Sequence, residues 1–395
     1  MKKQSIDSKS ARPKPWYDPR VRALFFQVIT LAVVFWAGWV LIDNTLSNME
    51  SRGISTGFGF LDETAGFGII MHLVPFDATM SYGRTFWVGL TNTLLVSAMG
   101  VVAATIIGFL VGVARLSSNW LVAKIALVYI EVIRNIPLLL QIFFWYFAVL
   151  ASLPAPRQSV EIGGAFFLNN RGLYLPGPVT QDGFGLVWGA VLVAIAAVFG
   201  LRNWAKKRQK ASGQIFPTVK VSIAVLVLLP LVAFLMAGQP LEWDLPALKG
   251  FNFGGGISLI PELAALWVAL SLYTASFIAE IVRSGILAVS KGQTEASKAL
   301  GLPNGLTLRL IVIPQAMRVI IPPLTSQYLN LVKNSSLATA IGYPDLVSVF
   351  MGTTLNQTGQ AVEVVAITMG VYLTISLLIS LLMNVYNRAA EIKER

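Results

Sequence analysis

Hydrophobic residues form long runs along this chain, and the segments between the runs hold most of the charged residues. A bilayer core about 30 Å thick needs about 20 apolar residues per helix. Runs that approach or exceed this length occupy residues 23–42, 86–113, 123–153, 186–201, 219–237, 257–282, 320–341 and 361–385. They are apolar throughout and do not alternate, which is typical of membrane helices and not of a barrel. The pattern predicts an all-α, polytopic transmembrane protein with about eight spans.

The first run follows a basic tail at residues 1–22. A cleavable signal peptide is the alternative interpretation. The run at 23–42 is too long for one, and no small-residue cleavage site follows it. We therefore expect a membrane anchor that stays on the protein.

The net charge of +11 comes from 30 Lys and Arg against 19 Asp and Glu. In a soluble protein this excess would indicate a nucleic-acid partner. If the N-terminus lies inside, 23 basic residues fall in inner segments and five in outer ones. Because Lys and Arg favour the cytoplasmic side, the distribution predicts an N-in, C-in topology with an even number of spans and no nucleic-acid partner. The basic cluster at 204–210 either contacts anionic membrane lipid or only anchors this topology.

Composition narrows the chemistry further. Only 12% of residues are charged, about half of the share in a soluble domain, which argues against an ordinary soluble enzyme. There is no cysteine, His72 is the single histidine, and no Gly-Lys pair is present for a phosphate-binding loop. We expect no catalytic residue, no metal site and no cofactor in this chain. If ATP drives the protein, a separate chain must bind and hydrolyse it.

The inner segment at residues 283–320 is less apolar than the spans, but its apolar and polar residues follow a helical pattern. An amphipathic helix is predicted at residues 293–300, where Gly301 can supply the positive φ that ends it. Asn304 then opens a second, more apolar stretch. The result is a helix–turn–helix along the inner face, of a kind that a groove on a globular partner can receive.

Five residues of this segment keep a fixed spacing: Glu295, Ala296, Ser297, Gly301 and Pro314. The pattern E-A-S-x₃-G-x₉-I-x-I-P resembles the EAA motif of ABC importer permeases, E-A-A-x₃-G-x₉-I-x-L-P, with Ser297 and Ile313 as departures. The resemblance implies that residues 293–301 form a coupling helix, which fits a cleft on a separate ATP-hydrolysing subunit. A small residue remains at position 297, so we expect the packing of this helix to be kept.

Other segments resemble the polar amino-acid permeases of the same family. Their motif E-x-x-R-(G/N)-x-P-L-L-x-Q is matched here by Glu131, Arg134, Asn135, Pro137 and Gln141. Residues 278–285 and 331–337 resemble further segments of that group. The resemblance implies a five-span core at 86–113, 123–153, 257–282, 320–341 and 361–385. The three added spans resemble the long permease subunits of general L-amino-acid importers of Gram-negative bacteria.

The spans and the resemblance together divide the chain into five regions. They are a cytoplasmic basic tail (1–22), an extra span with a periplasmic loop (23–85), the first part of the permease core (86–153), an insertion with two extra spans (154–256), and the second part of the core (257–395) with the coupling loop (283–320).

Ionisable groups within spans cost about 2.5–3.5 kcal/mol each near the centre, so they normally face a partner or a cavity. Glu131 and Arg134 are spaced to pair on one helix face, and Glu280 and Arg283 repeat this spacing. Two interpretations are open: these pairs line or gate a solute pathway, or they are structural pairs near the cytosolic helix ends.

Further candidates for the pathway lie around a break in the second core span and near the end of the fourth. Pro137 breaks its helix between Asn135 and Gln141, and a broken helix is tolerated where it lines a cavity. Lys333 and Asn334 either bind the carboxylate end of an amino acid or only snorkel and pack. Gly108 and Gly112 form a small-xxx-small pattern, which favours close helix packing.

The sequence and its resemblances together predict a permease subunit of an ABC importer in the bacterial inner membrane. It would move amino acids, of a broad L-amino-acid range, into the cytoplasm. The expected partners are an ATPase dimer, a second permease subunit that we expect to be a different chain, and a periplasmic amino-acid-binding protein. The alternative is a secondary transporter driven by an ion gradient, which would explain the intramembrane Glu and Arg residues without ATP. A membrane-embedded enzyme is disfavoured, since no nucleophile–base pair or metal cluster is visible.

Overall fold

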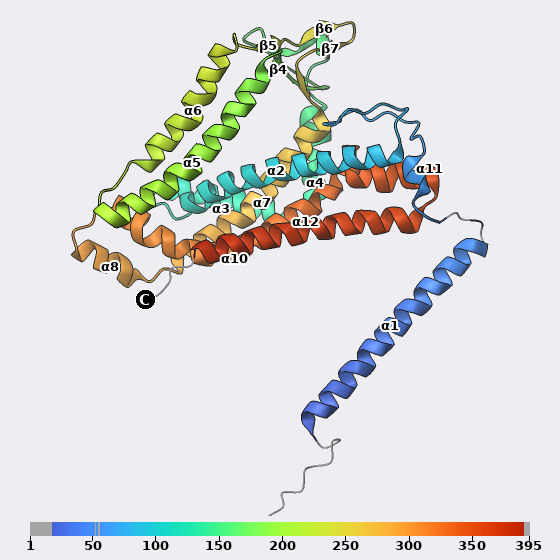
Figure 1. The fold of residues 1–395 in the computed structure, drawn as a ribbon, viewed down its shortest axis with the longest axis horizontal. Helices are drawn as coiled ribbons and strands as arrows, with labels where there is room; N and C mark the ends of the chain where they lie inside the picture. The colour runs from blue at the N-terminus through green and yellow to red at the C-terminus, as the bar shows by residue number, and fades with distance from the viewer. Residues whose placement is uncertain (1–17, 52, 54–55, 391–395) are drawn as a thin grey trace, which may run out of the picture.

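A computed structural model of the chain describes residues 18–51, 53 and 56–390. The first 17 residues of the predicted basic tail lie outside this part of the chain. Long helices dominate; in Figure 1 the small β-sheets lie at the top of the view and the short helix α8 lies at the lower left.

The long helices are α1 (Pro19–Ser51), α2 (Tyr82–Ala114), α3 (Trp120–Asn135), α5 (Phe184–Ser212), α6 (Thr218–Met236), α7 (Pro261–Leu287), α10 (Ile313–Asn334) and α12 (Ala361–Ala390). The shorter helical segments are η2 (Gly59–Asp62), α4 (Leu138–Phe143), η3 (Phe144–Leu150), η4 (Pro156–Gln158), α8 (Lys291–Ala299), α9 (Asn304–Thr307), η5 (Leu308–Val312), η6 (Ser335–Ile341), η7 (Val347–Thr354) and α11 (Leu355–Thr358).

The number of spans agrees with the hydrophobic pattern. Within the described residues, seven helices are long and apolar enough to cross a membrane, or eight if a bent pair counts as one span. The bent pair is α3 with the helix at Leu138–Leu150, and the chain bends by 105° between them. The prediction of a polytopic helical protein with about eight spans is confirmed. The even count that an N-in, C-in topology needs is reached when this pair is one span.

Helix α7 is the centre of the bundle and packs against α2, α3 and α10. The most extensive packing is against α2, where the two glycines of its small-xxx-small pattern face α7. A Cβ on Gly108 would lie 2.6 Å from Ile278 Cβ, and one on Gly112 would lie 2.7 Å from the Ala279 carbonyl oxygen. The predicted close packing at these glycines is confirmed, since any side chain there would displace α7.

The three helices outside the predicted five-span core lie at the periphery. In Figure 1, α1 stands apart from the other helices, and α5 and α6 form a hairpin beside the bundle. The basic segment at 202–212, which the pattern assigns to an inner loop, is the last part of α5. It is helical up to Ser212, and Gly213 ends the helix with a φ of +69°.

The sequence pattern did not predict a group of short β-strands, which we call the β-layer. They are β1 (Val160–Ile162), β2 (Phe166–Asn169), β3 (Gly172–Leu175), β4 (Gly177–Thr180), β5 (Leu241–Asp244), β6 (Ala247–Lys249), β7 (Asn252–Gly254) and β8 (Ile257–Leu259). They form an antiparallel sheet in the order β1-β2-β3-β8 and two antiparallel pairs, β4 with β5 and β6 with β7. Because β4 precedes α5 and β5 follows α6, their pairing joins the two outer ends of the hairpin.

One predicted boundary is wrong as a result. Residues 257–259 were expected at the start of a span, but they form β8, whose Ile257 pairs with Leu175 of β3. Helix α7 begins only at Pro261. The fixed φ of proline and its missing N–H suit the first position of a helix. The strand before it is apolar enough to resemble the helix that follows.

Candidate functional site

The inner loop with the EAA-like residues folds as two helical segments joined by a tight turn. Helix α8 ends at Ala299, and Gly301 follows with a φ of +74°, a conformation that glycine adopts at little cost. The Gly301 amide donates to the Lys298 carbonyl at 2.9 Å. Asn304 then opens α9, which continues through η5 into α10. The predicted helix–turn–helix is confirmed.

One face of α8 is fastened to the segments that follow it. Ser297 is buried, and its hydroxyl lies 3.0 Å from the hydroxyl of Thr307 in α9. The Gln315 amide of α10 donates to Gln293 Oε1 at 3.2 Å. Ser297 is therefore more than a small residue at a packing position, because its hydroxyl joins the two arms of the loop.

The opposite face of α8 is open to a partner. Glu295 and Ala296 are exposed, and so are Leu300 and Leu310, which follow the helix. Leu300 is 80% exposed and Leu310 is 60% exposed. An exposed acidic side chain and exposed leucines in the same loop, with one face of α8 bonded to the segments that follow, are suited to docking in a groove.

The break in the second core segment is built around Pro137. Ile136 and Pro137 are both extended, and helix α4 starts at Leu138. Gln141 is buried, and its amide donates to the carbonyls of Ile133 and Ile136, both at 2.9 Å. These are carbonyls near the end of α3, so Gln141 satisfies backbone groups that the break frees. Its amide therefore fixes the bend.

The two predicted Glu–Arg pairs differ in the structure. Arg283 forms an ion pair with Glu280, with Nε 3.0 Å from Oε2. Glu131 and Arg134 do not form one, because Arg134 lies over the ring of Phe277, 4.9 Å from its centroid. In the described part of the chain, Glu280–Arg283 is the one ion pair.

Residues 131–137 are mostly exposed on the single chain. Glu131, Arg134, Asn135 and Pro137 all face outward, and the Asn135 amide donates to the Glu131 carbonyl at 2.6 Å. Polar groups exposed on a span need a polar surface opposite them. This stretch is therefore a candidate for the side of the chain that faces a partner subunit or a pathway.

Lys333 opens into a cavity of about 360 Å³. The cavity lies between α10, η6, η7 and α12, and its lining includes Lys333, Ser336, Val347, Met351, Thr368 and Tyr372. One cation, three hydroxyl-bearing side chains and flexible apolar side chains suit a small ligand with an anionic end. Asn334 follows Lys333 in the chain but does not line this cavity.

A buried polar junction between α2 and the segment after η6 was not predicted. The Asn92 amide donates to the carbonyls of Met71 and Pro344, both at 2.9 Å. The Tyr343 hydroxyl donates to the Asn92 carbonyl, and the fully buried Asp345 accepts from the Ser348 amide at 2.8 Å. The signal available in the sequence was Asp345 itself, a lone acidic residue in an apolar stretch near the end of a span.

Metal binding is not indicated by this part of the structure. Among the described residues, no group of three or more His, Asp or Glu side chains could hold a metal ion.

Comparisons with known proteins place this sequence among transport proteins. Residues 104–392 match the family described as binding-protein-dependent transport system inner membrane component. The putative amino-acid ABC transporter permease protein YhdX of Escherichia coli is 58% identical over 96% of both chains. The general L-amino acid transport system permease protein AapQ of Rhizobium johnstonii is 52% identical over 96% of this chain and 94% of its own.

A third relative is the glutamate/glutamine/aspartate/asparagine transport system permease protein BztB of Rhodobacter capsulatus. It is 43% identical over 96% of both chains. A solved structure described as an amino acid ABC transporter with histidines covers 78% of this chain and 95% of its own, at 20% identity and a TM-score of 0.45.

The family match spans most of the chain, and the three relatives align over nearly all of it. The resemblance given by the EAA-like residues is confirmed, as is the interpretation as a multi-pass inner-membrane permease of an ABC importer. The comparisons do not favour the ion-gradient alternative. This chain belongs to the family of binding-protein-dependent transport system inner membrane components.

Proposed function

We propose that this permease forms one half of a pathway that brings L-amino acids of a broad range into the cytoplasm. The names of the three relatives support an amino-acid solute. The observation that carries the mechanism is the two-sided α8, which exposes Glu295 and Ala296 while its other face is bonded to α9 and α10. A helix with one docking face and one bonded face can transmit movement of an ATPase subunit to α9 and α10.

The route of that force runs from α8 into the core. An ATPase subunit binds the exposed face of α8 and holds ATP and Mg²⁺, while this chain supplies no catalytic residue. Movement of α8 passes through the Ser297–Thr307 and Gln293–Gln315 contacts to α10. Helix α10 in turn packs against α7 at Gly285, where an added Cβ would lie 2.3 Å from Ile320 Cγ1. Contact this close makes the two helices move together.

Two regions are proposed to meet the solute. Lys333 binds the solute carboxylate in its cavity, where Ser336 adds a hydroxyl and Met351 an adaptable apolar wall. Glu131, Arg134, Asn135 and Pro137 line the face towards the second permease subunit. The Glu280–Arg283 pair and Gln141 have a structural role, because the two charges pair with each other and the Gln141 amino group is bonded to backbone carbonyls.

The second permease subunit is proposed to be a different chain. The core that pairs with it comprises residues 86–153 and 257–395, and residues 23–85 and 154–256 are additions. Helices α1, α5 and α6 lie outside the packed core in Figure 1. The added helices lie at the periphery and are not needed for packing of the core. Their presence supports a specialised subunit, because a partner subunit without them can still supply the same core. A periplasmic amino-acid-binding protein delivers solute to the outer face.

Membrane lipid is a further proposed partner, at the inner end of the α5–α6 hairpin. A cavity of about 390 Å³ lies there, lined by Arg202, Lys206, Gln209, Phe216 and Thr218. Residues 183–241 include no acidic residue. The hairpin is exposed and apolar over the rest of its length, so an acyl chain can lie beside it while the headgroup meets Arg202 and Lys206.

Reconstitution tests the main proposal. The chain is placed in proteoliposomes with its second permease, ATPase and binding protein, and uptake of L-glutamine, L-glutamate and L-arginine is measured with and without internal ATP. Uptake should require ATP, and Lys333→Gln should lower the maximal rate about tenfold by removing a charged hydrogen bond. Lys249→Gln, on the exposed strand β6, is the matched control. Uptake without the ATPase subunit, driven by an ion gradient, would overturn the proposal.

A further inference from the structure

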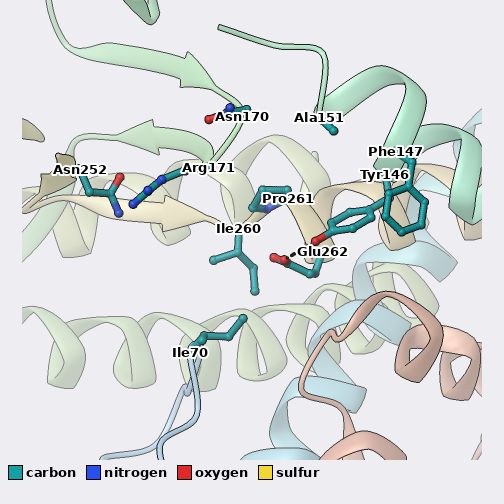
Figure 2. A pocket seen from close by; sticks show the side chains of 10 residues that line it. All are labelled: Ile70, Tyr146, Phe147, Ala151, Asn170, Arg171, Asn252, Ile260, Pro261 and Glu262. Carbon is teal, nitrogen blue, oxygen red and sulfur yellow. Dashed lines mark hydrogen bonds between the residues drawn. The ribbon is translucent and has the colours of Figure 1, made fainter. Parts of the chain in front are cut away.

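A cavity of about 450 Å³ lies where the β-layer meets the outer end of α7. Its polar lining comes from three parts of the chain: Tyr146 of η3, Arg171 between β2 and β3, and Glu262 at the start of α7 (Figure 2). Asn252 of β7 adds an amide. This cavity is separate from the one that Lys333 lines and shares no residue with it.

Glu262 is held in place as an acceptor. It follows Pro261 in the first turn of α7, where the positive end of the helix dipole favours an anion. The Tyr146 hydroxyl donates to Glu262 Oε1 at 2.8 Å, as Figure 2 shows. This contact joins the bent core span to α7 and leaves the second carboxylate oxygen for another donor.

Arg171 is positioned by the turn that carries it. Its amide donates to Asn169 Oδ1 at 2.8 Å, and the Asn169 amide donates to Ser159 Oγ at 2.9 Å. The next residue, Gly172, has a φ of +132°, and a Cβ there would lie 2.3 Å from the Leu259 carbonyl oxygen. The turn therefore rests directly on β8, and the base of Arg171 is fixed at the cavity.

The two opposite charges share the cavity without pairing. In the described part of the chain, the one ion pair is Glu280–Arg283, so neither Glu262 nor Arg171 has a partner of opposite charge within 4.0 Å. The Tyr174 hydroxyl donates to Asn252 Oδ1 at 2.9 Å, which leaves the Asn252 amino group for an acceptor. A ligand that carries both charges would satisfy all three side chains.

We propose that this cavity is an outer binding site for the zwitterionic end of an α-amino acid. Arg171 and the Asn252 amino group bind the carboxylate, and Glu262 binds the ammonium. The apolar side chains of Ile70 and Ile260 form the wall for a variable side chain. A cavity of this size accommodates a small ligand. The inference rests on the proposed amino-acid solute and adds a second site, outside the membrane core, where solute pauses on its way through the permease.

The absence of native cysteine gives a direct test. Ala151 lines the cavity, so Ala151→Cys is introduced and the assembled transporter is labelled from outside with a membrane-impermeant maleimide. L-glutamine or L-glutamate should slow labelling of this chain in a saturable way, whereas glycerol should not. Val160→Cys, exposed on strand β1, is the control and should label at the same rate with or without amino acid.

Second substitutions in the Ala151→Cys chain separate recognition from folding. Arg171→Gln and Glu262→Gln should each raise the concentration for half-protection about tenfold or more, because each removes a charged hydrogen bond. Tyr146→Phe keeps both charges and should raise it less. Arg157→Gln, on η4 of the same layer, should leave it unchanged.

The outcomes separate this inference from the function on which it rests. If the transporter takes up L-glutamine but Ala151→Cys is not protected, or the charge variants do not shift protection, the outer site is wrong and the importer stands. If wild-type transporter takes up no amino acid under ATP, both proposals fail together.

Discussion

Helix α7 and the two helices of the α5–α6 hairpin are all membrane helices, but α7 is packed inside the protein and the hairpin is largely exposed. In the most apolar stretch of α7, 61% of residues are buried, against 17% in α5 and 6% in α6. Helix α7 is nevertheless less hydrophobic than either. Lipid is as apolar as leucine, so helices associate through small and polar residues that permit close contact. The buried face of α7 contains Ala269, Ser276 and Gly285, whereas the hairpin presents large apolar side chains to lipid.

The largest expected effect comes from adding volume where α2 meets α7. A Cβ at Gly112 would lie 2.7 Å from the Ala279 carbonyl oxygen, whereas one at Gly200 of α5 would have no neighbour within 4 Å. Gly112→Val should therefore destabilise the fold by about 1–3 kcal/mol or more and remove most monodisperse protein in fluorescence-detected size-exclusion chromatography. Gly200→Val carries the same change in helix propensity and should be recovered normally. Equal recovery of the two variants would mean that the core tolerates added volume as well as the hairpin does.

The second effect concerns coupling and leaves the fold intact. Glu295→Lys reverses the exposed charge of α8, and Gly301→Pro is incompatible with the φ of +74° that ends this helix. Both should abolish uptake and solute-stimulated ATP hydrolysis while insertion into the membrane stays normal. Glu161→Lys, the same charge reversal on the exposed strand β1, should retain both activities. Normal stimulation in the α8 variants would show that the ATPase does not act through this helix.

The third effect tests the bond behind α8. Ser297→Ala restores the residue of the EAA pattern but leaves the buried Thr307 hydroxyl without Ser297 as its partner, which should cost about 1–3 kcal/mol locally. Adding Thr307→Val removes the second hydroxyl at similar shape and should recover most of the loss. Thermal unfolding and solute-stimulated ATPase measure both variants. Identical values for the single and double variants would mean that the hydroxyl pair does not support the loop.

Long sequence patterns predicted the structure better than short ones. Long apolar runs and the glycine that ends α8 are local features, so the spans and the helix–turn–helix were predicted. The strands are only three or four residues long, which is too short for alternation to be recognised. The prediction therefore joined residues 257–259 to the helix that begins at Pro261.

Side-chain partners across the fold were predicted less well. The spacing of Glu131 and Arg134 permits an ion pair, but Arg134 instead meets Phe277 from α7, far away in the sequence. The Ser297–Thr307 bond needs the turn at Gly301 to bring its two hydroxyls together. The outer cavity depends on Arg171 and Glu262, which come from a sheet and a helix that no local pattern connects.

The smallest expected effect lies at the inner end of the hairpin. Arg202→Gln with Lys206→Gln removes two charges from the cavity proposed to hold an anionic headgroup. Each charge near an anionic surface is worth about 1 kcal/mol, so retention of phosphatidylglycerol through purification should fall several-fold in native mass spectrometry. Uptake should change less than about twofold, since the hairpin packs mainly on itself. Lys291→Gln with Lys298→Gln, two exposed residues of α8, removes the same charge from the inner face without touching the cavity and should keep the lipid. Equal lipid retention in the two double variants would mean that the basic cluster acts only as a topology anchor. In that case, the hairpin would differ from the core in packing but would have no ligand of its own.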